Sequence, residues 1–376
     1  MLNILWFRRD LRISDHLPLL MAVSDGFVAP LVIVEPDYWA QPYASARQWR
    51  FAARAITALR SQLAVIGAPL IVRTGEATEV IAALQEKSKD VSIWSHDTVG
   101  SRWEAARDAR VTAWIEEMGI PWHRMADTGG PWSVEGASDP WTQVLAEPPV
   151  VPPDLMIAHG VLPGRVVSER ILYLDDDPCE DLPAGPAGAR RVLDAFMDAA
   201  EAGDAGPTEI EEAIAGLAPH LAWGTLSARE TWNELERLKP DADEIACAMQ
   251  DRLLDMLAPV SDEDMAETDA DVTPSLEVGK IGDAISDVPV LSAAFSTLQT
   301  HGIIREDLLW LMAQCAASRL SCEAQTVLDA LAPLRTAYVE ARRSIVRLPE
   351  GAGSADTGSD LGAALAAIDP GRLAAE

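Results

Sequence analysis

Apolar runs and helical stretches alternate along the first 125 residues of the chain. The apolar runs have the length of buried strands, and the stretches between them place apolar residues every three or four positions, the period of a helix. The predicted strands are Leu2–Phe7, Val28–Val34, Leu70–Val72, Val91–Trp94 and a weaker one near Pro121–Met125; the predicted helices are Ser45–Ile66, Ala77–Gln85 and Ser101–Met118. Strand–helix–strand units of this length predict an α/β domain with a five-stranded parallel, Rossmann-like sheet and right-handed crossovers.

Charged residues follow three of the predicted strands. Ligands of parallel α/β sheets bind beyond the carboxyl ends of the strands. The pattern therefore predicts a ligand cleft near Arg8–Asp10, Glu35–Asp37 and His96–Asp97.

The alternation stops near residue 129, and the chain divides into four predicted regions. The α/β domain covers 1–128, a Pro- and Gly-rich connector covers 129–188, a smaller all-α domain covers 189–348, and a disordered tail covers 349–376. The helices expected in the third region are Ala189–Ala202, Thr208–Leu217, Ser227–Leu238, Asp243–Leu257, Val290–His301, Arg305–Ser318 and Cys322–Arg347. The acidic stretch Ser261–Asp271 is predicted to be an exposed loop.

Composition adds an uneven charge to this picture. The 376 residues include 30 basic and 59 acidic side chains, a net charge of −29, and residues 1–130 account for only −1 of it. A phosphate-binding surface needs clustered arginine and lysine, so DNA binding by the acidic all-α domain is not expected. A solubility or salt adaptation of the whole proteome explains the same acidity equally well.

Several classes of protein are excluded by what the sequence does not contain. No apolar run reaches the roughly 18–20 residues of a membrane span, and the chain does not begin with a basic and then apolar leader. The four cysteines form no CxxC pair, and the histidines are scattered, so we expect free thiols, no zinc site and a cytoplasmic protein. The cysteines are Cys179, Cys247, Cys315 and Cys322.

The opening sequence NILWFRRDLRISDH is the most specific motif. Its apolar strand runs directly into Arg8, Arg9, Asp10, Arg12, Asp15 and His16. Alternating arginine and aspartate predict a lattice of charge-assisted hydrogen bonds, and a clamp at a domain interface is favoured over a catalytic centre. Nine of the twelve tryptophans lie in the first 141 residues, mostly as expected core or interface residues, with stacking on a ligand as the alternative.

Two motifs resemble the photolyase/cryptochrome family. ILWFRRDLRISDH resembles the first strand and loop of its α/β domain, and LAPHLAWGTLSARETW (Leu217–Trp232) resembles the start of its helical flavin-binding domain. The resemblance extends over about residues 1–345. It implies a five-stranded α/β domain, a helical domain that binds FAD, and light-driven DNA repair or blue-light sensing.

The chain departs from the family where the flavin would bind. Ile214, Ala215 and Ala218 replace hydroxyl-bearing residues that hold the FAD phosphates, and side chains without a hydroxyl cannot donate to them. Arg252 alone remains of a Trp-Arg-x-Phe motif, which makes it the residual FAD-binding candidate. Gly302–Leu309 lacks the aromatic, asparagine and arginines of another motif, and the segment that closes over the flavin ring has no counterpart. We therefore expect the ordinary FAD site to be lost or rebuilt.

The α/β domain retains residues that resemble the site of an antenna chromophore, such as a deazaflavin, flavin mononucleotide or folate. Arg47 resembles an antenna-contacting arginine, and Asp97 resembles an aspartate of the same pocket. A surface ion pair or a helix cap explains each residue equally well.

Three functions remain open at this point. The first hypothesis is a divergent paralogue without ordinary DNA repair that acts as a binding or partner protein for an unidentified protein. The second is a deoxyribodipyrimidine photolyase-like enzyme that holds FAD in a rearranged pocket with Arg252. The third is a light sensor whose only chromophore lies in the α/β domain. No catalytic residue and no metal ligand is assigned.

Overall fold

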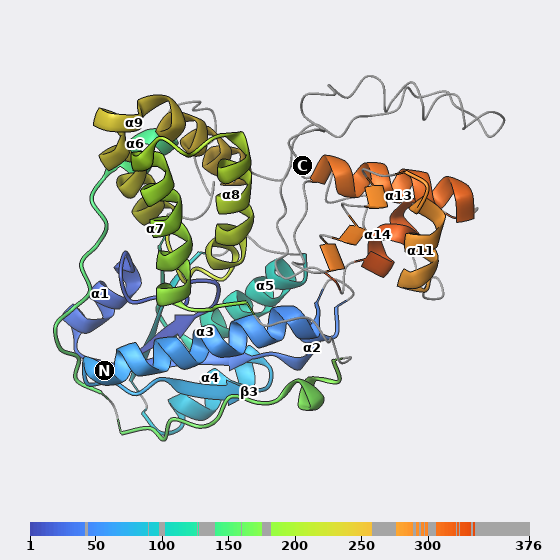
Figure 1. Ribbon diagram of the computed structural model, residues 1–376. Coiled ribbons are helices and arrows are strands. Elements are labelled where there is room, and N and C mark those ends of the chain that lie inside the picture. Colours follow the sequence, from blue (N-terminus) through green and yellow to red (C-terminus); the bar gives the residue numbers. More distant parts are fainter. Residues whose placement is uncertain are drawn as a thin grey trace.

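Five parallel strands form a single sheet in the order β3-β2-β1-β4-β5 (Figure 1). The strands are β1 (Leu2–Phe7), β2 (Phe27–Val34), β3 (Ile71–Thr74), β4 (Val91–His96) and β5 (Trp122–Met125). This computed structural model describes residues 1–41, 44–88, 90–97, 102–125, 127, 140–158, 160–174, 182–257, 276–288, 291–292, 295–296, 298–299, 306–320, 322, 324–331 and 334. The sheet confirms the predicted α/β class.

The central strand β1 is buried along its whole length because helices cover both faces of the sheet. Its side chains alternate between two hydrophobic clusters. Leu5 and Phe7 pack with Leu59 of helix α3 (Ala46–Val65), which Figure 1 shows crossing one face. Ile4 and Trp6 pack on the other face with helices α4 (Ala77–Gln85) and α5 (Arg102–Met118).

Two helices of the α/β domain, α1 and α3, begin at side-chain caps. Ser45 and Gln48 form a capping box at the start of α3, which accounts for the accuracy of that predicted boundary. Two helices were not predicted, α1 (Leu17–Asp25) and the single-turn α2 (Pro36–Trp39). His16 caps α1, since its Nδ1 accepts a hydrogen bond from the Leu19 N–H at 3.1 Å.

A three-helix unit stands above the sheet at the upper left of Figure 1. It consists of α7 (Pro186–Ala202), α8 (Pro207–Ala222) and α9 (Ala228–Leu257), with a core that includes Leu193, Leu217 and Met249. Two helices were predicted in place of α9, with a break near Pro240. The structure confirms this break, because two helical stretches meet at a kink where Ala242 leaves the helical conformation (φ −146°, ψ 52°).

A second helical unit has a core of its own (right of Figure 1). It contains α11 (Val278–Ile285), α13 (Glu306–Leu320) and α14 (Ala324–Leu331), packed around Ile281, Phe295, Met312 and Val327. The described parts of the helical region thus pack around separate hydrophobic cores. The predicted boundaries of the four regions stay predictions. The predicted acidic loop and the 349–376 tail lie outside the described residues.

The connector follows the edge of the α/β domain. It includes α6 (Pro140–Ala146) and a 3-10 helix (Glu169–Leu172). Backbone hydrogen bonds join Asp15 to Val150, at 2.7 Å, and Val28 to Ile157, at 3.0 Å. Among the helices that the structure describes, none combines the length and apolar character needed to cross a membrane.

Candidate functional site

The loop after β1 joins the α/β domain to the α7–α9 unit. Arg12, buried and 1% exposed, donates to the backbone oxygens of Asp15 and Gly224 and forms an ion pair of 2.6 Å with Asp127. The Leu11 N–H donates to the Trp223 oxygen at 3.1 Å. These contacts confirm the clamp that the arginine and aspartate pattern predicted.

Two further contacts extend the clamp to the start of α9. The Ser14 hydroxyl donates to Glu230 at 2.5 Å, and Arg229 forms an ion pair of 3.1 Å with Asp15. Asp15 is 2% exposed, so this pair is largely shielded from water. Buried pairs of this kind fix the relative position of two elements because losing one partner leaves an uncompensated charge.

Asp10, His16 and His96 form a buried cluster with the composition of a metal site. Asp10 Oδ2 lies 3.0 Å from His16 Nε2 and 2.8 Å from His96 Nδ1, and Asp10 Oδ1 accepts the Arg8 backbone N–H at 2.7 Å. His16 Nδ1 already accepts the Leu19 N–H, so a neutral His16 carries its proton on Nε2, facing Asp10. A metal ligand needs that nitrogen unprotonated. The cluster is therefore arranged as a hydrogen bond between Asp10 and His96, with the His16 ring in close contact with the same carboxylate.

The protonation of this cluster follows from its burial. Burial, and then the neighbouring His96, lowers the pKa of His16 to about 4, so His16 is neutral at pH 7. Burial alone would raise the pKa of Asp10, but the two imidazoles facing its carboxylate hold that pKa well below its ordinary value. Asp10 is thus an ionised acceptor that organises the loop after β1.

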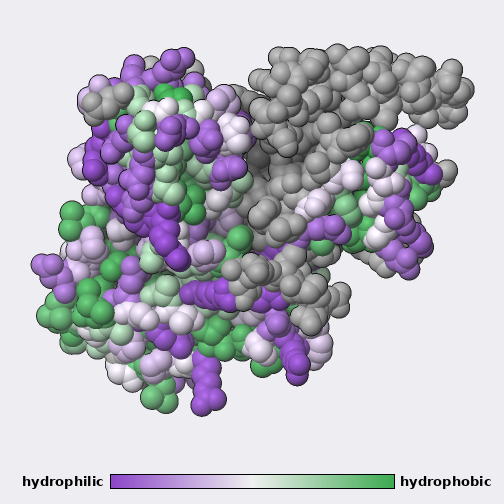
Figure 2. Space-filling view, viewed as in Figure 1, coloured by the Kyte–Doolittle hydropathy of each residue, from purple (hydrophilic) through white to green (hydrophobic). Residues whose placement is uncertain are grey.

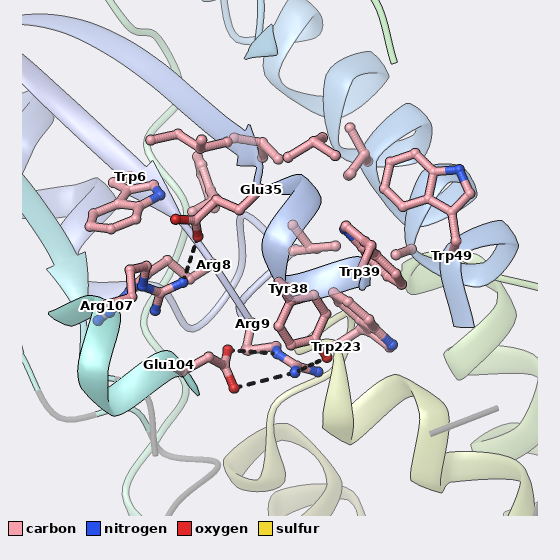
Figure 3. Close-up of a pocket in the computed structure, with 17 residues that line it drawn as sticks. Trp6, Arg8, Arg9, Glu35, Tyr38, Trp39, Trp49, Glu104, Arg107 and Trp223 are labelled. Atoms are coloured by element: carbon pink, nitrogen blue, oxygen red, sulfur yellow. Dashed lines mark hydrogen bonds and ion pairs between the residues drawn. The ribbon is translucent and has the colours of Figure 1, made fainter. Parts of the chain in front are cut away.

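A small cavity lies beyond the carboxyl ends of β1 and β2 (Figure 3). Its volume is about 60 Å³. Arg107 of α5 donates to Glu35 and to Asp108, both at 2.9 Å, and Arg8 donates to Asp108 at 2.6 Å. Trp6 lies beside both guanidinium groups, 5.1 Å from Arg8 and 5.2 Å from Arg107. On this side the cavity is lined by arginine and carboxylate side chains that are hydrogen-bonded to one another around the Trp6 ring.

Aromatic side chains fill the opposite side of the cavity. Trp39 and Trp223 stack with ring centroids 5.7 Å apart and planes 3° apart, and Trp49 meets Trp39 edge-on at 4.9 Å. Arg9 lies over the rings of Trp223, at 4.4 Å, and Tyr38, at 5.1 Å. Figure 3 shows Trp223 of the α8–α9 turn beside the α2 aromatics, so the stack spans both domains.

This cavity does not accommodate a tricyclic antenna chromophore. Ligand pockets for such molecules have volumes of about 300–1,000 Å³, and the aromatic stack leaves about 60 Å³. The tryptophans of this stack have the core or interface role that was expected for most tryptophans of the chain.

The two predicted antenna residues have protein partners. Arg47, at the start of α3, is 4% exposed and donates to the backbone oxygens of Leu298 (3.2 Å), Gln299 (2.8 Å) and Leu334 (2.9 Å). Asp97, after β4, forms an ion pair with Arg124. Arg47 thus contacts the second helical unit, and the antenna role of both residues stays a prediction.

The predicted FAD-binding residue Arg252 lies elsewhere. It is on α9, 36% exposed at its side chain, and forms a bidentate pair with Glu211 at 2.9 and 3.1 Å. Arg252, Arg47 and Asp97 each contact a different part of the chain.

The residues that the resemblance assigns to the FAD phosphates are apolar. Ile214 and Ala218 are buried, 9% and 3% exposed, and Ile214 packs in the α7–α9 core. Phosphate charges facing these side chains would be buried without donors, at several kcal/mol per ion. Gly302–Leu309 lies partly outside the described residues.

Sequence reasoning missed the charged residues that α5 contributes. Glu104, Arg107 and Asp108 lie three and four positions apart, on one helix face over the ends of β1 and β2. That spacing indicates a charged helix face in the sequence, but it does not show which strands the face covers. Nothing in the sequence indicated that Trp39 and Trp223 are in contact.

Known proteins resemble the chain over more than half of its length. The family model described as DNA photolyase matches residues 3–139. A deoxyribodipyrimidine photo-lyase of Agrobacterium fabrum is 29% identical over 263 residues, 62% of this chain and 53% of that protein. The corresponding protein of Halobacterium salinarum is 27% identical over 273 residues, 64% and 56%. A cryptochrome DASH of Natronomonas pharaonis is 23% identical over 269 residues, 63% and 56%. The chain thus spans about half the length of these relatives.

Solved structures share the fold. A bacterial class III photolyase from Agrobacterium tumefaciens superposes with a TM-score of 0.64 at 20% identity, covering 89% of this chain and 77% of that one. A Synechocystis cryptochrome gives a TM-score of 0.64 at 15% identity, covering 90% and 79%. With the sheet order and the sequence matches, these similarities support membership of the photolyase/cryptochrome family.

Proposed function

We propose that this chain is a divergent photolyase/cryptochrome homologue that does not perform ordinary light-driven DNA repair and acts as a binding or partner protein. The main support for the proposal is that buried apolar side chains occupy the positions where the family has phosphate-binding hydroxyls. Ile214 and Ala218 are buried where hydroxyls are expected, and Arg252 is neutralised by Glu211. Ile214 and Ala218 have no side-chain donor, and the Arg252 guanidinium is already bonded to a carboxylate.

The charge distribution supports the same proposal. Residues 131–376 carry a net charge of −28, and Figure 2 shows hydrophilic side chains along the visible face of the α7–α9 unit. Such a surface repels a phosphate backbone and attracts a protein with a positively charged surface. We place the protein in the cytoplasm, since Cys247, Cys315 and Cys322 are free thiols among the described residues.

The direct test is flavin retention. The chain and the Agrobacterium fabrum relative are purified in parallel, and near-ultraviolet and blue absorbance is recorded before and after FAD addition and desalting. We expect no retained flavin spectrum for this chain. A stoichiometric flavin that survives desalting would overturn the proposal.

DNA binding gives an independent test. Binding to duplexes with and without a pyrimidine dimer is titrated against salt, with the same relative as the positive control. We expect no saturable binding at moderate salt, because counterion release needs clustered cations. Tight binding of the damaged duplex contradicts the proposal even when no flavin is retained.

A second candidate is an FAD-dependent photolyase or blue-light photoreceptor with a rearranged pocket. Its support is the sequence match, which continues over about 270 residues to proteins named deoxyribodipyrimidine photo-lyase and cryptochrome. Retained flavin together with light-dependent loss of pyrimidine dimers supports the photolyase. Retained flavin without dimer loss supports the photoreceptor.

A further inference from the structure

A group of exposed apolar side chains lies around the amino ends of β2 and β3, at the end of the strands opposite to the cavity. They come from α1, the first residue of β2, the end of α3 and the connector. We call them the amino-end patch: Leu17, Met21, Phe27, Val65, Leu155 and Ile157. Figure 2 shows hydrophobic side chains along the left edge of the molecule, where Figure 1 places α1 and the N-terminus.

The connector joins two sides of this patch. The Val28 N–H donates to the Ile157 oxygen at 3.0 Å, next to the start of β2. The Met156 N–H donates to the Ile66 oxygen at 2.7 Å, at the end of α3. Met156 is buried, whereas Leu155 and Ile157 on either side of it are exposed, as in an extended segment with alternating side chains. The connector thus presents two apolar side chains to solvent between β2 and α3.

Helix α1 extends the patch on the other side of β2. Its Leu19 and Ala22 are fully buried, which fixes the face that packs on the domain. Leu17 and Met21, one turn apart, lie on the outer face and are 40% and 41% exposed. Phe27 begins β2 directly after this helix and is half-exposed. The outer face of α1 is thus apolar, although a solvent-facing helix surface is ordinarily polar.

The patch has the size of one side of a stable protein interface. Its side chains are 40–85% exposed, which gives roughly 500–700 Å² when a whole side chain has about 150–200 Å². A standard interface buries about 800 Å² per partner, of which about 56–65% is apolar. The largest apolar patch of an ordinary monomer has about 300–600 Å². The amino-end patch is therefore large enough to supply the apolar part of an interface.

Charge selects the occupant of the patch. The exposed neighbours Asp25 and Asp154 are acidic, and the chain as a whole carries −29. An anionic membrane surface is therefore repelled, and a basic protein is drawn to the helical half, where −28 of the charge lies. A second copy of this chain offers a nearly neutral α/β domain with the same apolar patch. It is the occupant that fits both the apolar surface and the charge.

We propose that the chain forms a two-fold symmetric homodimer through the amino-end patch. In such an interface the same surface of each copy covers that of the other, so one self-complementary patch is enough. The carboxyl ends of the strands then lie at the outer sides of the pair. The dimer does not depend on the proposed function, because the residues of the patch are outside the flavin positions and the acidic helices.

The test is sedimentation equilibrium of the full chain from about 1 to 100 μM, at low and high salt. We expect a reversible monomer–dimer equilibrium. Dimerisation should strengthen severalfold between about 0.1 M and about 1 M sodium chloride, because salt screens the repulsion between two acidic chains. A monomer over the whole concentration range would overturn the proposal.

Two other outcomes identify a different occupant. Species that keep growing with concentration contradict a two-fold interface, which closes at two copies. A chain that stays monomeric but binds neutral phosphatidylcholine vesicles has a lipid-binding patch, which also overturns the dimer.

Two isoleucines of the connector provide a matched pair of variants. Ile157 of the patch is 58% exposed, and Ile171 of the 3-10 helix is 55% exposed. Figure 1 places that 3-10 helix at the side of the α/β domain away from the N-terminus. Ile157→Glu should weaken dimerisation at least tenfold, because the two-fold axis buries two uncompensated charges. Ile171→Glu adds the same charge outside the patch and should leave dimerisation unchanged.

A second patch variant keeps the test decisive if Ile157→Glu does not fold. Val65, at the end of α3, is 85% exposed, so a substitution there hardly disturbs the core. Val65→Glu should also weaken dimerisation at least tenfold. A folded Val65→Glu chain that dimerises as tightly as the unaltered chain would place the interface elsewhere and overturn the proposal.

Discussion

At Gly224 the backbone of the α8–α9 turn lies against the backbone of the loop after β1. Its φ of +59° is in the left-handed region, and a Cβ there would lie 2.5 Å from Asp10 Cα and 2.8 Å from the Arg9 carbonyl carbon. Both neighbours are backbone atoms that Arg12 and Asp10 hold in place. Gly224→Ala should therefore lower the free energy of unfolding by roughly 2–4 kcal/mol, measured by urea denaturation.

Gly203 provides the matched control for this substitution. It also has a positive φ, +77°, but a Cβ at this position would have no neighbouring atom within 4 Å. Gly203→Ala should cost only about 1–2 kcal/mol, the penalty of the left-handed conformation. Equal losses for the two variants would mean that conformation, and not contact between the domains, determines the effect at Gly224.

His16 makes the stability of the protein depend on pH. Its pKa is about 4 in the folded protein and 6.5 in the reference state, so the unfolded chain binds the proton more tightly. Stability contributed by neutral His16 is complete above pH 6.5 and is lost as pH falls to 4. The difference corresponds to about 3 kcal/mol. The free energy of unfolding, measured across this pH range, should fall accordingly.

A variant separates the contribution of His16 from that of His220, which is also buried. His220 also has a pKa lowered to about 4, mainly by burial, and acts in the same pH window. His16→Asn removes one titrating group while its side chain can still cap α1. Its stability should fall less steeply between pH 6.5 and 4 than that of the unaltered chain. Superimposable pH profiles would contradict the role of His16.

Among the helices, α3 connects the sheet to the second helical unit through Arg47. Three backbone oxygens, of Leu298, Gln299 and Leu334, accept from one guanidinium. Hydrogen bonds from a charged donor contribute about 1.5–3 kcal/mol each. Arg47→Met should therefore accelerate amide exchange in α13 and α14 by about 10–100-fold, since about 1.4 kcal/mol corresponds to tenfold.

The control for this prediction lies on the same helix. Arg60 is exposed at its contact and donates one long hydrogen bond, 3.4 Å, to the Gly164 oxygen. Arg60→Met should leave exchange in α13 and α14 unchanged, and neither variant should alter exchange in β1. Unchanged exchange in Arg47→Met would show that the core of the second helical unit, without Arg47, determines its local stability.

The accuracy of the predicted elements depended on their length and environment. Strands buried on both faces are continuous apolar runs, which is why Leu2–Phe7 was predicted to the residue. The helices α1, α2 and α11 have four to nine residues, too few for a clear helical period. Histidine is not one of the residues that usually cap helices, so the sequence did not indicate where α1 begins.

The candidate site was predictable only in part because its residues come from several elements. Arg8 and Glu35 directly follow strands, and the strand-end rule located them. Arg107 could not be placed, because its position depends on how α5 packs over the sheet. Arg47 was assigned to an antenna site by resemblance, whereas its contacts are to backbone more than 250 residues away, which local sequence does not encode.

For the whole molecule, the uneven charge predicts a local response to salt. Residues 131–376 carry −28 of the net charge, and their mutual repulsion destabilises the helical half. Salt shortens the screening length from about 10 Å at 0.1 M to about 3 Å at 1 M. Raising sodium chloride over this range should slow amide exchange in α7–α9 and change it little in β1 and β4, whose domain is nearly neutral. Sucrose, which stabilises without screening charge, should slow exchange in both halves. An equal response of both halves to salt would show that the acidic surface does not limit the stability of the helical half.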